Sequence, residues 1–233
     1  MAREKVIILN SGGLNSAVMT SMAAKDYICA AMHARFGHRA AECEAALFEK
    51  QADCFGVKDR LVVDMPHIAA VGGSARVNRK MTIEDALAMD ANESPIHVAG
   101  LIGSLTFAAF NWAHHLGATK ILVGVSDTLG PPGPRTAAVF PDYSRDFLHI
   151  ANQLLSAAST AKSITVEAPL IDLSRAEIIK LGQRLNTPFE STWSCISSGS
   201  EPCGGCIGCV TRQRGFLDAA LPDPILLQSV GAA

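Results

Sequence analysis

Four of the seven cysteines lie close together near the C-terminus, with the spacing C-x7-C-x2-C-x2-C. They are Cys195, Cys203, Cys206 and Cys209. Two overlapping C-x2-C turns bring three sulfurs within reach of one ion, and the glycines between them let the backbone turn tightly. Cys195 completes a four-thiolate set. Because zinc favours tetrahedral sulfur ligation, the spacing predicts one structural Zn²⁺ per chain.

Other uses of these cysteines have to be weighed against zinc. Spacing alone does not separate a zinc site from an iron–sulfur cluster, so that alternative stays open. A disulfide framework is disfavoured, because no secretory segment is evident and reducing compartments keep thiols free. The remaining cysteines, Cys29, Cys43 and Cys54, occur singly and are expected to be core residues.

A glycine turn, SGGLNS at residues 11–16, follows an apolar run. Such a turn exposes backbone N–H groups beside a helix N-terminus, whose partial positive charge attracts anions. Ser11 and Ser16 add hydroxyl donors for phosphate oxygens. The turn is therefore a candidate phosphate site. The alternative is a tight strand-to-helix turn in which Ser11 or Asn15 only caps the helix.

Alternating apolar runs and helical patterns supply the scaffold for both motifs. The expected strands are at residues 5–9, 28–34, 60–64, 121–125 and 166–169. The expected helices are at 15–25, 40–55, 101–116, 144–159 and 175–185, the last of the chain. Near-continuous apolar strands between helices indicate an α/β fold, a doubly wound parallel sheet of about five strands. Ligands bind at the carboxyl ends of such strands, where the glycine turn lies.

Two segments are expected to be irregular, 71–95 and 129–141. The second contains four prolines within eleven residues, which excludes regular structure. Long loops at strand ends often close over ligands, so this segment is predicted to be a substrate lid.

Composition limits the remaining possibilities. With 233 residues, 48% of them hydrophobic, the chain can bury one good core and carry a small module. The expected division is a nucleotide-binding domain over 1–190, a zinc module over 191–220 and a tail over 221–233. The net charge of −2 gives no electrostatic case for binding nucleic acid or membranes. No apolar run reaches transmembrane length, and a cytoplasmic protein is expected.

The glycine turn combined with the segments STWSC, CGGCIGC and RQRGF resembles the 7-cyano-7-deazaguanine synthase family. The turn is similar to the pyrophosphatase loop SGGxD[ST] of enzymes that adenylate their substrates. FGHRAAE is similar to the family's YGQRHxxE, FPDYSRDF to its YPDCR-x-x-F, and VEAPLIDLSRAEIIKLG to its ETPL…KAEI run. The resemblance covers nearly the whole chain and implies an adenine nucleotide alpha-hydrolase-like fold.

The sequence departs from the family pattern in two places near the nucleotide. Asn15 stands where the family loop has Asp, which keeps the size but removes a carboxylate. Leu101 and Ile102 stand where the family's VPGRN segment has Arg and Asn. An Arg there would make bidentate, charge-assisted bonds to a phosphate or carboxylate, and Leu cannot.

The resemblance implies an ATP-dependent ligase that converts 7-carboxy-7-deazaguanine to 7-cyano-7-deazaguanine with ammonia, in queuosine or deazapurine biosynthesis. It implies ATP and Mg²⁺ beside Zn²⁺, small-molecule partners, no nucleic acid, and a homodimer. The residues expected to bind the nucleotide are Ser11, Gly12, Gly13, Leu14, Asn15 and Ser16. The expected catalytic residues are Ser11, Asn15 and Asp127.

Four further residues have two interpretations each. Asp127, after the fourth expected strand, could meet the purine edge or a metal, or could cap a turn. His33, ending the second strand, is a candidate nucleotide contact or a structural residue. Arg39 and Lys120 are weaker candidates for anion contact and could equally be solvated surface residues.

Other functions remain open from the sequence. The chain could be a catalytically silent relative that serves as a binding or assembly subunit, or a relative that adenylates a different acceptor. A zinc module that binds nucleic acid is least favoured, because it offers only Arg212, Arg214 and one aromatic residue, Phe216.

Overall fold

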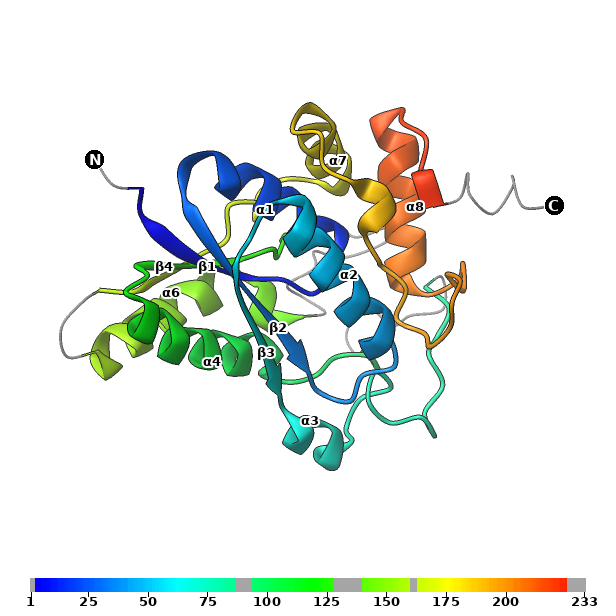
Figure 1. Cartoon of the computed structure of the whole chain (residues 1–233). Helices are drawn as coiled ribbons and strands as arrows, with labels where there is room; N and C mark the ends of the chain where they lie inside the picture. Colours follow the sequence, from blue (N-terminus) through cyan, green and yellow to red (C-terminus); the bar gives the residue numbers. More distant parts are fainter. Residues whose placement is uncertain (1–2, 87–93, 128–139, 160–162, 226–233) are drawn as a thin grey trace.

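Five parallel strands form one sheet in the computed structural model, which describes residues 3–86, 94–127, 140–159 and 163–225 (Figure 1). The strand order is β3-β2-β1-β4-β5. The strands are β1 (Lys5–Leu9), β2 (Ile28–Arg35), β3 (Asp59–Asp64), β4 (Lys120–Val123) and β5 (Thr165–Glu167). Leu9, which ends β1, lies opposite Met32 of β2 and Val123 of β4. The predicted α/β fold with a doubly wound parallel sheet is confirmed.

Helices cover both faces of this sheet (Figure 1). One face carries α1 (Leu14–Asp26), α2 (Ala41–Cys54), α7 (Arg175–Arg184) and α8 (Ile207–Ala219). The other face carries α4 (Leu101–Leu116) and α6 (Arg145–Ala158). The shorter elements are α3 (Pro66–Val71) and two 3₁₀ turns, η1 (Pro141–Tyr143) and η2 (Phe189–Ser191).

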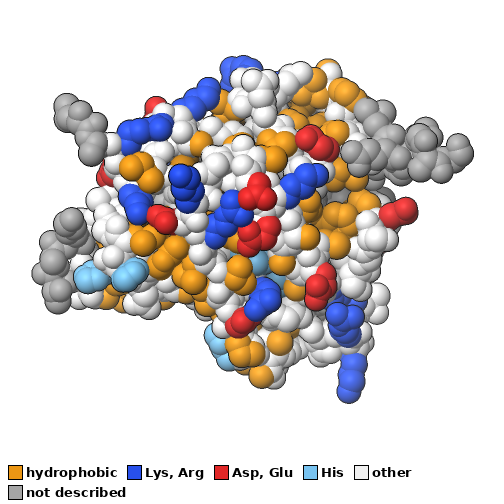
Figure 2. Space-filling model, viewed as in Figure 1, with side chains coloured by type: hydrophobic (Ala, Val, Ile, Leu, Met, Phe, Trp, Pro, Cys, Tyr) orange, Lys and Arg blue, Asp and Glu red, His pale blue; other side chains and the backbone are white. Residues whose placement is uncertain are grey.

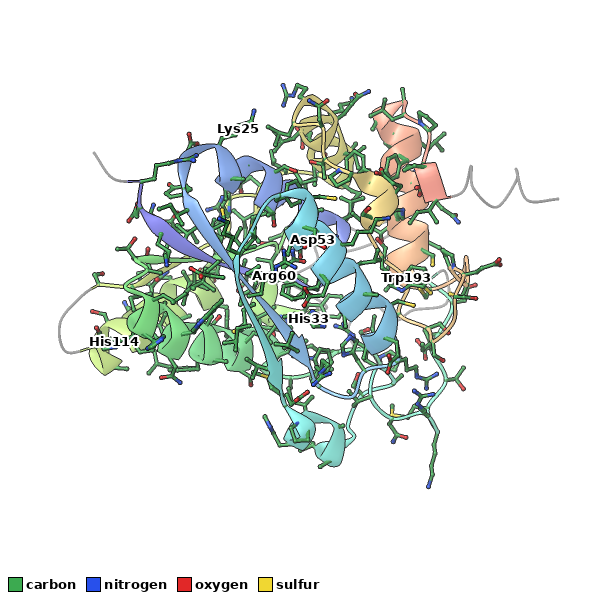
Figure 3. All side chains as sticks on the ribbon, in the orientation of Figure 1. Lys25, His33, Asp53, Arg60, His114 and Trp193 are labelled. Carbon is green, nitrogen blue, oxygen red and sulfur yellow. The ribbon has the colours of Figure 1, made fainter. Side chains whose placement is uncertain are left out.

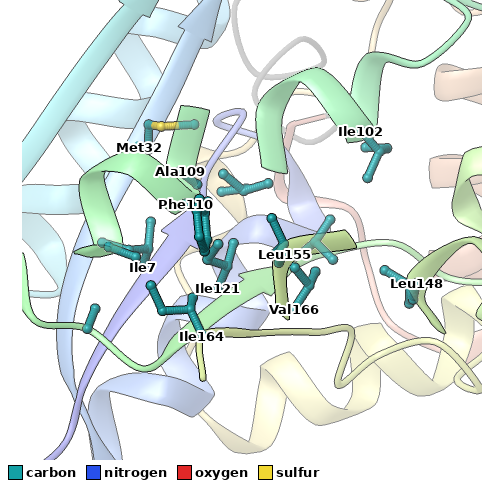
Figure 4. Packing of buried hydrophobic residues seen from close by; sticks show 14 of the residues in the cluster. Ile7, Met32, Ile102, Ala109, Phe110, Ile121, Leu148, Leu155, Ile164 and Val166 are labelled. Atoms are coloured by element: carbon teal, nitrogen blue, oxygen red, sulfur yellow. The ribbon is translucent and has the colours of Figure 1, made fainter. Parts of the chain in front are cut away.

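Alternating side chains of β1 explain why both faces are covered. Val6 and Ile8 pack with α1, α7 and α8, whereas Ile7 and Leu9 pack with α4 and α6. Figure 4 shows the cluster on the face covered by α4 and α6, in which Ile7 of the sheet lies near Phe110 of α4. Each fully buried aliphatic side chain stabilises the fold by roughly 1.5–3 kcal/mol, so neither face can be left open to water.

One helix was not predicted from the sequence. The helix at 175–185 was expected to be the last, but α8 begins directly after Cys206, includes Cys209 and packs against α7. Two glycines within α8 prevent its prediction from the sequence, because glycine lowers helix propensity. Both are required by close packing: a Cβ at Gly208 would lie 1.9 Å from Ser194 O, and one at Gly215 would lie 2.1 Å from Arg175 Cγ.

The two segments expected to be irregular are covered unevenly by the structure. Residues 128–139, which make up most of the predicted lid, lie outside the described residues. In the segment 71–95, the described part contains an ordered turn. Its Ser74 O accepts hydrogen bonds from Val77 N and Asn78 N, at 3.1 and 2.8 Å. This turn lies against the site described below.

The face of the molecule seen in Figure 2 shows basic and acidic side chains interspersed. Arg60, for example, forms ion pairs with Glu49 and Asp53 of α2, at 2.8 and 2.6 Å. Such a mixed surface creates no single-sign field on this face. Within the described residues, every helix is too short or too polar to span a bilayer.

Candidate functional site

A cavity of about 280 Å³ opens at the carboxyl ends of the central strands. The strand order reverses between β1 and β4, and open α/β sheets bind ligands at such a reversal. The cavity is lined by the ends of β1, β2 and β4, the start of α1, the start of α4, and the segment around Trp193. The glycine turn, a wall of apolar side chains and the cysteine-bearing segment therefore meet at one place.

The glycine turn at 11–13 has a backbone conformation that only glycine allows. Gly12 has a φ of +73°, and a Cβ there would lie 2.5 Å from Glu44 O in α2. Gly12 N donates to Asn10 Oδ1 at 2.8 Å, while Gly12 O accepts from Trp193 N and Gln51 Nε2, both at 3.0 Å. The turn is thus fixed by hydrogen bonds from three sides, and its own N–H groups donate to Asn10, Ser11 and Ser16 side chains.

The N-terminus of α1 is open for an anion. Gly13 is the N-cap, so no cap side chain bonds the first-turn N–H groups of Leu14, Asn15 and Ser16, and the first turn contains no acidic residue. The hydroxyls of Ser11 and Ser16 lie 3.2 Å apart at the same edge. All of the residues predicted to bind the nucleotide except Gly12 line the cavity.

Asn15 joins three elements. Its Nδ2 donates to Gly124 O beyond β4 at 2.8 Å, and its Oδ1 accepts a hydrogen bond from Arg175 Nη1 at the start of α7. A carboxylate at this position could not donate to Gly124 O. The departure from the family's Asp therefore gives Asn15 a bridging contact.

Two arginines line the cavity, and sequence reasoning singled out neither of them. Arg175 stands at the first position of α7 and Arg76 in the ordered turn of 74–78. Burial, and secondarily the charge of Arg212, lower the pKa of Arg175 to about 10, so it remains a cation at neutral pH. For Arg175, its position in the RAEI segment was the only signal in the sequence. For Arg76, no local pattern distinguishes it from other arginines.

The predicted anion contacts Arg39 and Lys120 lie away from the cavity lining. Arg39 donates to the carbonyls of Asn78 and Met81, and Lys120 pairs with Glu167 at 2.9 Å. Both side chains are engaged in structural contacts in the described part of the chain.

His33 lines the floor of the cavity and is 1% exposed. Its Nδ1 lies 3.0 Å from Asn10 O, and because a carbonyl can only accept, Nδ1 carries the proton. Nε2 then has a free lone pair, and this buried atom finds no partner among the described residues. Burial lowers the pKa of His33, which keeps the ring neutral. Figure 3 shows His33 beneath α2, where it stacks on Phe48 at 5.2 Å.

The opposite wall of the cavity is apolar. Leu101 and Ile102 are 7% and 6% exposed, and Tyr143 lies beside them. The backbone N–H of Ile102 donates to Asp142 Oδ2 at 3.0 Å, so η1 caps the first turn of α4. Burial raises the pKa of Tyr143, which therefore stays neutral. This wall, made of Leu101, Ile102 and Tyr143, is called the α4 wall below.

Asp127, predicted to be catalytic, is not among the residues that line the cavity. It lies four residues beyond β4, and its backbone N–H donates to Ile171 O at 2.8 Å.

The four clustered cysteines have the geometry of a metal site. All four Sγ atoms lie within 4.8 Å of one another, with Cys203 to Cys209 and Cys195 to Cys206 both at 4.0 Å. A tetrahedron with zinc–sulfur bonds of about 2.3 Å has edges of about 3.8 Å, so the four sulfurs fit such an ion. Backbone N–H groups of Cys203 and Ile196 point at two of the sulfurs, as they do around thiolates. The neighbouring thiols lower the pKa of Cys206.

The cysteine cluster supports the glycine turn. Cys195, Cys206 and Cys209 share a buried cluster with Trp193 and Ala40. The backbone N–H of Trp193 in turn donates to Gly12 O, and Trp193 pairs with Gly13 in an isolated parallel β-bridge. In Figure 3, Trp193 lies next to the start of α8. A metal at the cysteines therefore stands two residues along the chain from the backbone that holds the turn.

Comparison with known proteins places the chain in a family. The family described as queuosine biosynthesis protein QueC matches residues 5–220. The 7-cyano-7-deazaguanine synthase of Koribacter versatilis (strain Ellin345) is 34% identical over 227 residues, covering 95% of this chain and 92% of its own. That of Acidobacterium capsulatum is 36% identical over 229 residues, covering 96% of each. The solved NMN synthetase of Francisella tularensis, at 13% identity and a TM-score of 0.46, is too distant to bear on function.

The matches extend across the sheet, the cavity and the cysteine cluster, and so confirm the resemblance found in the sequence. The chain belongs to the QueC family of queuosine biosynthesis proteins.

Proposed function

We propose that this protein is an ATP-dependent ligase that converts 7-carboxy-7-deazaguanine to 7-cyano-7-deazaguanine with ammonia. The observation that carries the proposal is the open N-terminus of α1 at the strand reversal, with Arg175 beside it. Backbone N–H groups and a fixed cation together fit a pyrophosphate. Family membership supplies the reaction, since the curated relatives are named 7-cyano-7-deazaguanine synthase.

The proposed reaction proceeds in two adenylations. The acceptor's carboxylate attacks the α-phosphate of ATP, pyrophosphate leaves, and ammonia displaces AMP to give an amide. A second ATP then adenylates the amide oxygen, and loss of AMP with a proton gives the nitrile. Each step needs stabilisation of charge and positioning rather than a covalent nucleophile.

Each part of the cavity has a role in this scheme. The hydroxyls of Ser11 and Ser16 and the uncapped N–H groups at the start of α1 hold the phosphates, and Arg175 neutralises the charge that develops on the departing pyrophosphate. The free Nε2 of His33 accepts a hydrogen bond from a ligand N–H or O–H. Asp127 is kept as a candidate whose part in catalysis depends on its reaching the ligand.

Cofactors and setting complete the proposal. The four thiolates hold a structural Zn²⁺, which fits their spacing and burial. Mg²⁺ would be held by the phosphates of ATP and by Glu44, the one carboxylate among the described residues lining the cavity. We also propose a cytoplasmic homodimer that acts on the free base and not on nucleic acid. Arg212 supports the last point, because it is 5% exposed and paired with Asp223 at 2.7 Å.

A second candidate is a relative that adenylates another acceptor. The α4 wall favours it, because Leu101 and Ile102 replace the Arg and Asn of the family segment. A catalytically silent binding subunit has no comparable support, since the cavity has an uncapped helix N-terminus and two arginines, Arg76 and Arg175.

The test is pyrophosphate release by the zinc-loaded protein with ATP, Mg²⁺, ammonia and 7-carboxy-7-deazaguanine, with products identified by mass. We expect two pyrophosphates per nitrile. Arg175→Met should lower the rate by about a hundredfold, as expected for a lost charge-assisted contact to phosphate. Arg184→Met, at the exposed end of the same helix, should leave it unchanged. ATP binding without pyrophosphate release from this acid would favour another acceptor, and absence of ATP binding would refute the proposal.

A further inference from the structure

The two arginines that line the cavity differ from several others in having no carboxylate partner among the described residues. Five arginines elsewhere are paired with carboxylates: Arg35 with Asp64, Arg60 with Glu49 and Asp53, Arg145 with Asp172, Arg212 with Asp223, and Arg214 with Asp218. Within the described residues, neither Arg76 nor Arg175 has such a partner. A partly buried cation without a counter-ion in a cavity is suited to an anionic ligand.

Arg175 and Arg76 lie at different places in the cavity. Arg175 bonds to Asn15 at the start of α1, where the phosphates are proposed to lie. The Arg76 guanidinium stands over the ring of Phe36, 5.4 Å from its centroid. Phe36 belongs to the same buried cluster as Leu101, so Arg76 lies next to the α4 wall. The cavity therefore offers a separate guanidinium group to each of two anions.

The position of Arg76 is set by its backbone. Ser74 and Ala75 are 2% and 0% exposed, and Ala75 N donates to Pro95 O at 2.7 Å. Arg76 O accepts from Arg39 N at 2.9 Å, which joins this turn to the end of the β2 region. The ring of Phe36 further restrains the guanidinium through a cation–π contact. Arg76 is therefore presented to the cavity in a fixed orientation.

We propose that Arg76 binds the carboxylate of the acceptor and supplies, from the facing turn, the cation that the family pattern places at position 101. The inference rests on the proposed function. In the family segment an Arg would extend from the first turn of α4, and here Leu101 occupies that position. A guanidinium over Phe36 can make two parallel bonds to a carboxylate, and Leu101 leaves room for the acceptor beside it. Arg76 is then the residue that selects an acid over a neutral acceptor.

The test compares a charged and a neutral acceptor on the same protein. The 7-carboxamide of 7-deazaguanine is the neutral intermediate of the proposed reaction and lacks the carboxylate. Arg76→Met keeps the aliphatic stem on Phe36 and removes the charge. It should raise KM for the acid by about ten- to a hundredfold, the effect of losing a charge-assisted pair. KM for ATP and KM for the carboxamide should stay within about twofold of the wild type.

Further variants separate charge from structure. Arg76→Lys should recover part of the affinity for the acid, and Arg76→Met combined with Leu101→Arg should restore most of it. Arg79→Met, an exposed arginine on the same segment, is the matched control and should behave as wild type. An unchanged melting temperature shows that Arg76→Met is folded. Direct titration of the acid into each variant by calorimetry gives the same comparison without turnover.

The possible outcomes distinguish this inference from the proposed function. If wild type turns over the acid and Arg76→Met has the same KM for it, the inference alone is wrong. Equal losses for acid and carboxamide would also overturn it, because they indicate a packing role. If wild type releases no pyrophosphate from the acid, the proposed function fails. Calorimetric affinity for the acid then still decides whether Arg76 binds a carboxylate.

Discussion

The two sides of the cavity recognise ligands by different means. The glycine turn and the start of α1 present backbone N–H groups, held by hydrogen bonds to Asn10, Gln51 and Trp193. The α4 wall presents only side chains. Backbone groups cannot be changed by substitution, whereas a side-chain wall can be rebuilt residue by residue. The departures from the family pattern largely follow this division, since Leu101 and Ile102 both lie on the α4 wall.

Asn15 is the one departure on the side of the glycine turn, and it supports the same lesson. Its amide oxygen accepts from Arg175, as a carboxylate could, and its amide nitrogen adds a hydrogen bond to Gly124 O, so the substitution keeps α1 joined to α7. We infer that the turn tolerates change only where the hydrogen bonds that fix it are kept. Acceptor recognition is free to vary on the other side.

The largest effect is expected from removing the metal that supports the turn. Cys206→Ser should release zinc and lower the melting temperature by roughly 10 °C or more, because structural zinc contributes about 10 kcal/mol or more of apparent binding energy. Cys54→Ser is the control, because Cys54 lies outside the cluster and is exposed; the sequence-based prediction that it is a core residue was wrong. Metal analysis and calorimetry measure both. Zinc retained by the Cys206 variant, or iron and sulfide in the wild type, would show that the metal assignment is wrong.

A smaller but more local effect is expected at the turn itself. Gly12→Ala places a Cβ against Glu44 O and forces alanine to a φ of +73°, so it should cost about 3 kcal/mol or more and abolish ATP binding. Gly56→Ala is a matched control, because its φ of +63° carries a similar backbone penalty but its Cβ would meet no atom within 4 Å. Similar losses in the two variants, measured by denaturation and ATP titration, would contradict the argument that the turn is sterically fixed.

The smallest effect on nucleotide binding is expected at the α4 wall. Leu101→Ala removes a side chain that is 7% exposed and should lower the free energy of unfolding by about 2–3 kcal/mol. It should leave the Kd for ATP within about twofold, because we propose that the phosphates bind on the other side. Leu217→Ala, at a leucine that is 76% exposed, controls for the substitution. A tenfold weaker Kd for ATP in the Leu101 variant would show that the two sides of the cavity are not independent.

The sequence predicted what depends on local pattern. Apolar periodicity located the five strands and most helices, and the cysteine spacing located four sulfurs that the fold brings together. Residues whose role depends on distant neighbours were not found. Arg76 lies in a segment expected to be irregular, and its position depends on Phe36 and on a turn tied to Pro95.

Local sequence pattern failed to predict α8, and it assigned Asp127 a role in the cavity that the structure does not support. α8 contains two glycines that look like helix breakers until their neighbours, Ser194 and Arg175, are known. Asp127 was predicted to be in the site because it follows a strand. In the structure its backbone N–H donates to Ile171 O, and Asp127 is not among the residues that line the cavity. Its catalytic role stays a prediction. Sequence order after a strand does not determine which way a side chain points.

The hydrogen bond from Trp193 N to Gly12 O links the proposed metal site to the proposed nucleotide site, and we expect binding at the two sites to be coupled. Whatever factor the metal contributes to nucleotide affinity, the nucleotide must return to metal affinity, since linkage between two sites is reciprocal. The cysteine site would then affect nucleotide affinity as well as the stability of the C-terminal segment. If the metal strengthens ATP binding, saturation with ATP would raise the protein's affinity for the ion in a zinc-poor cell, and depletion of ATP would lower it.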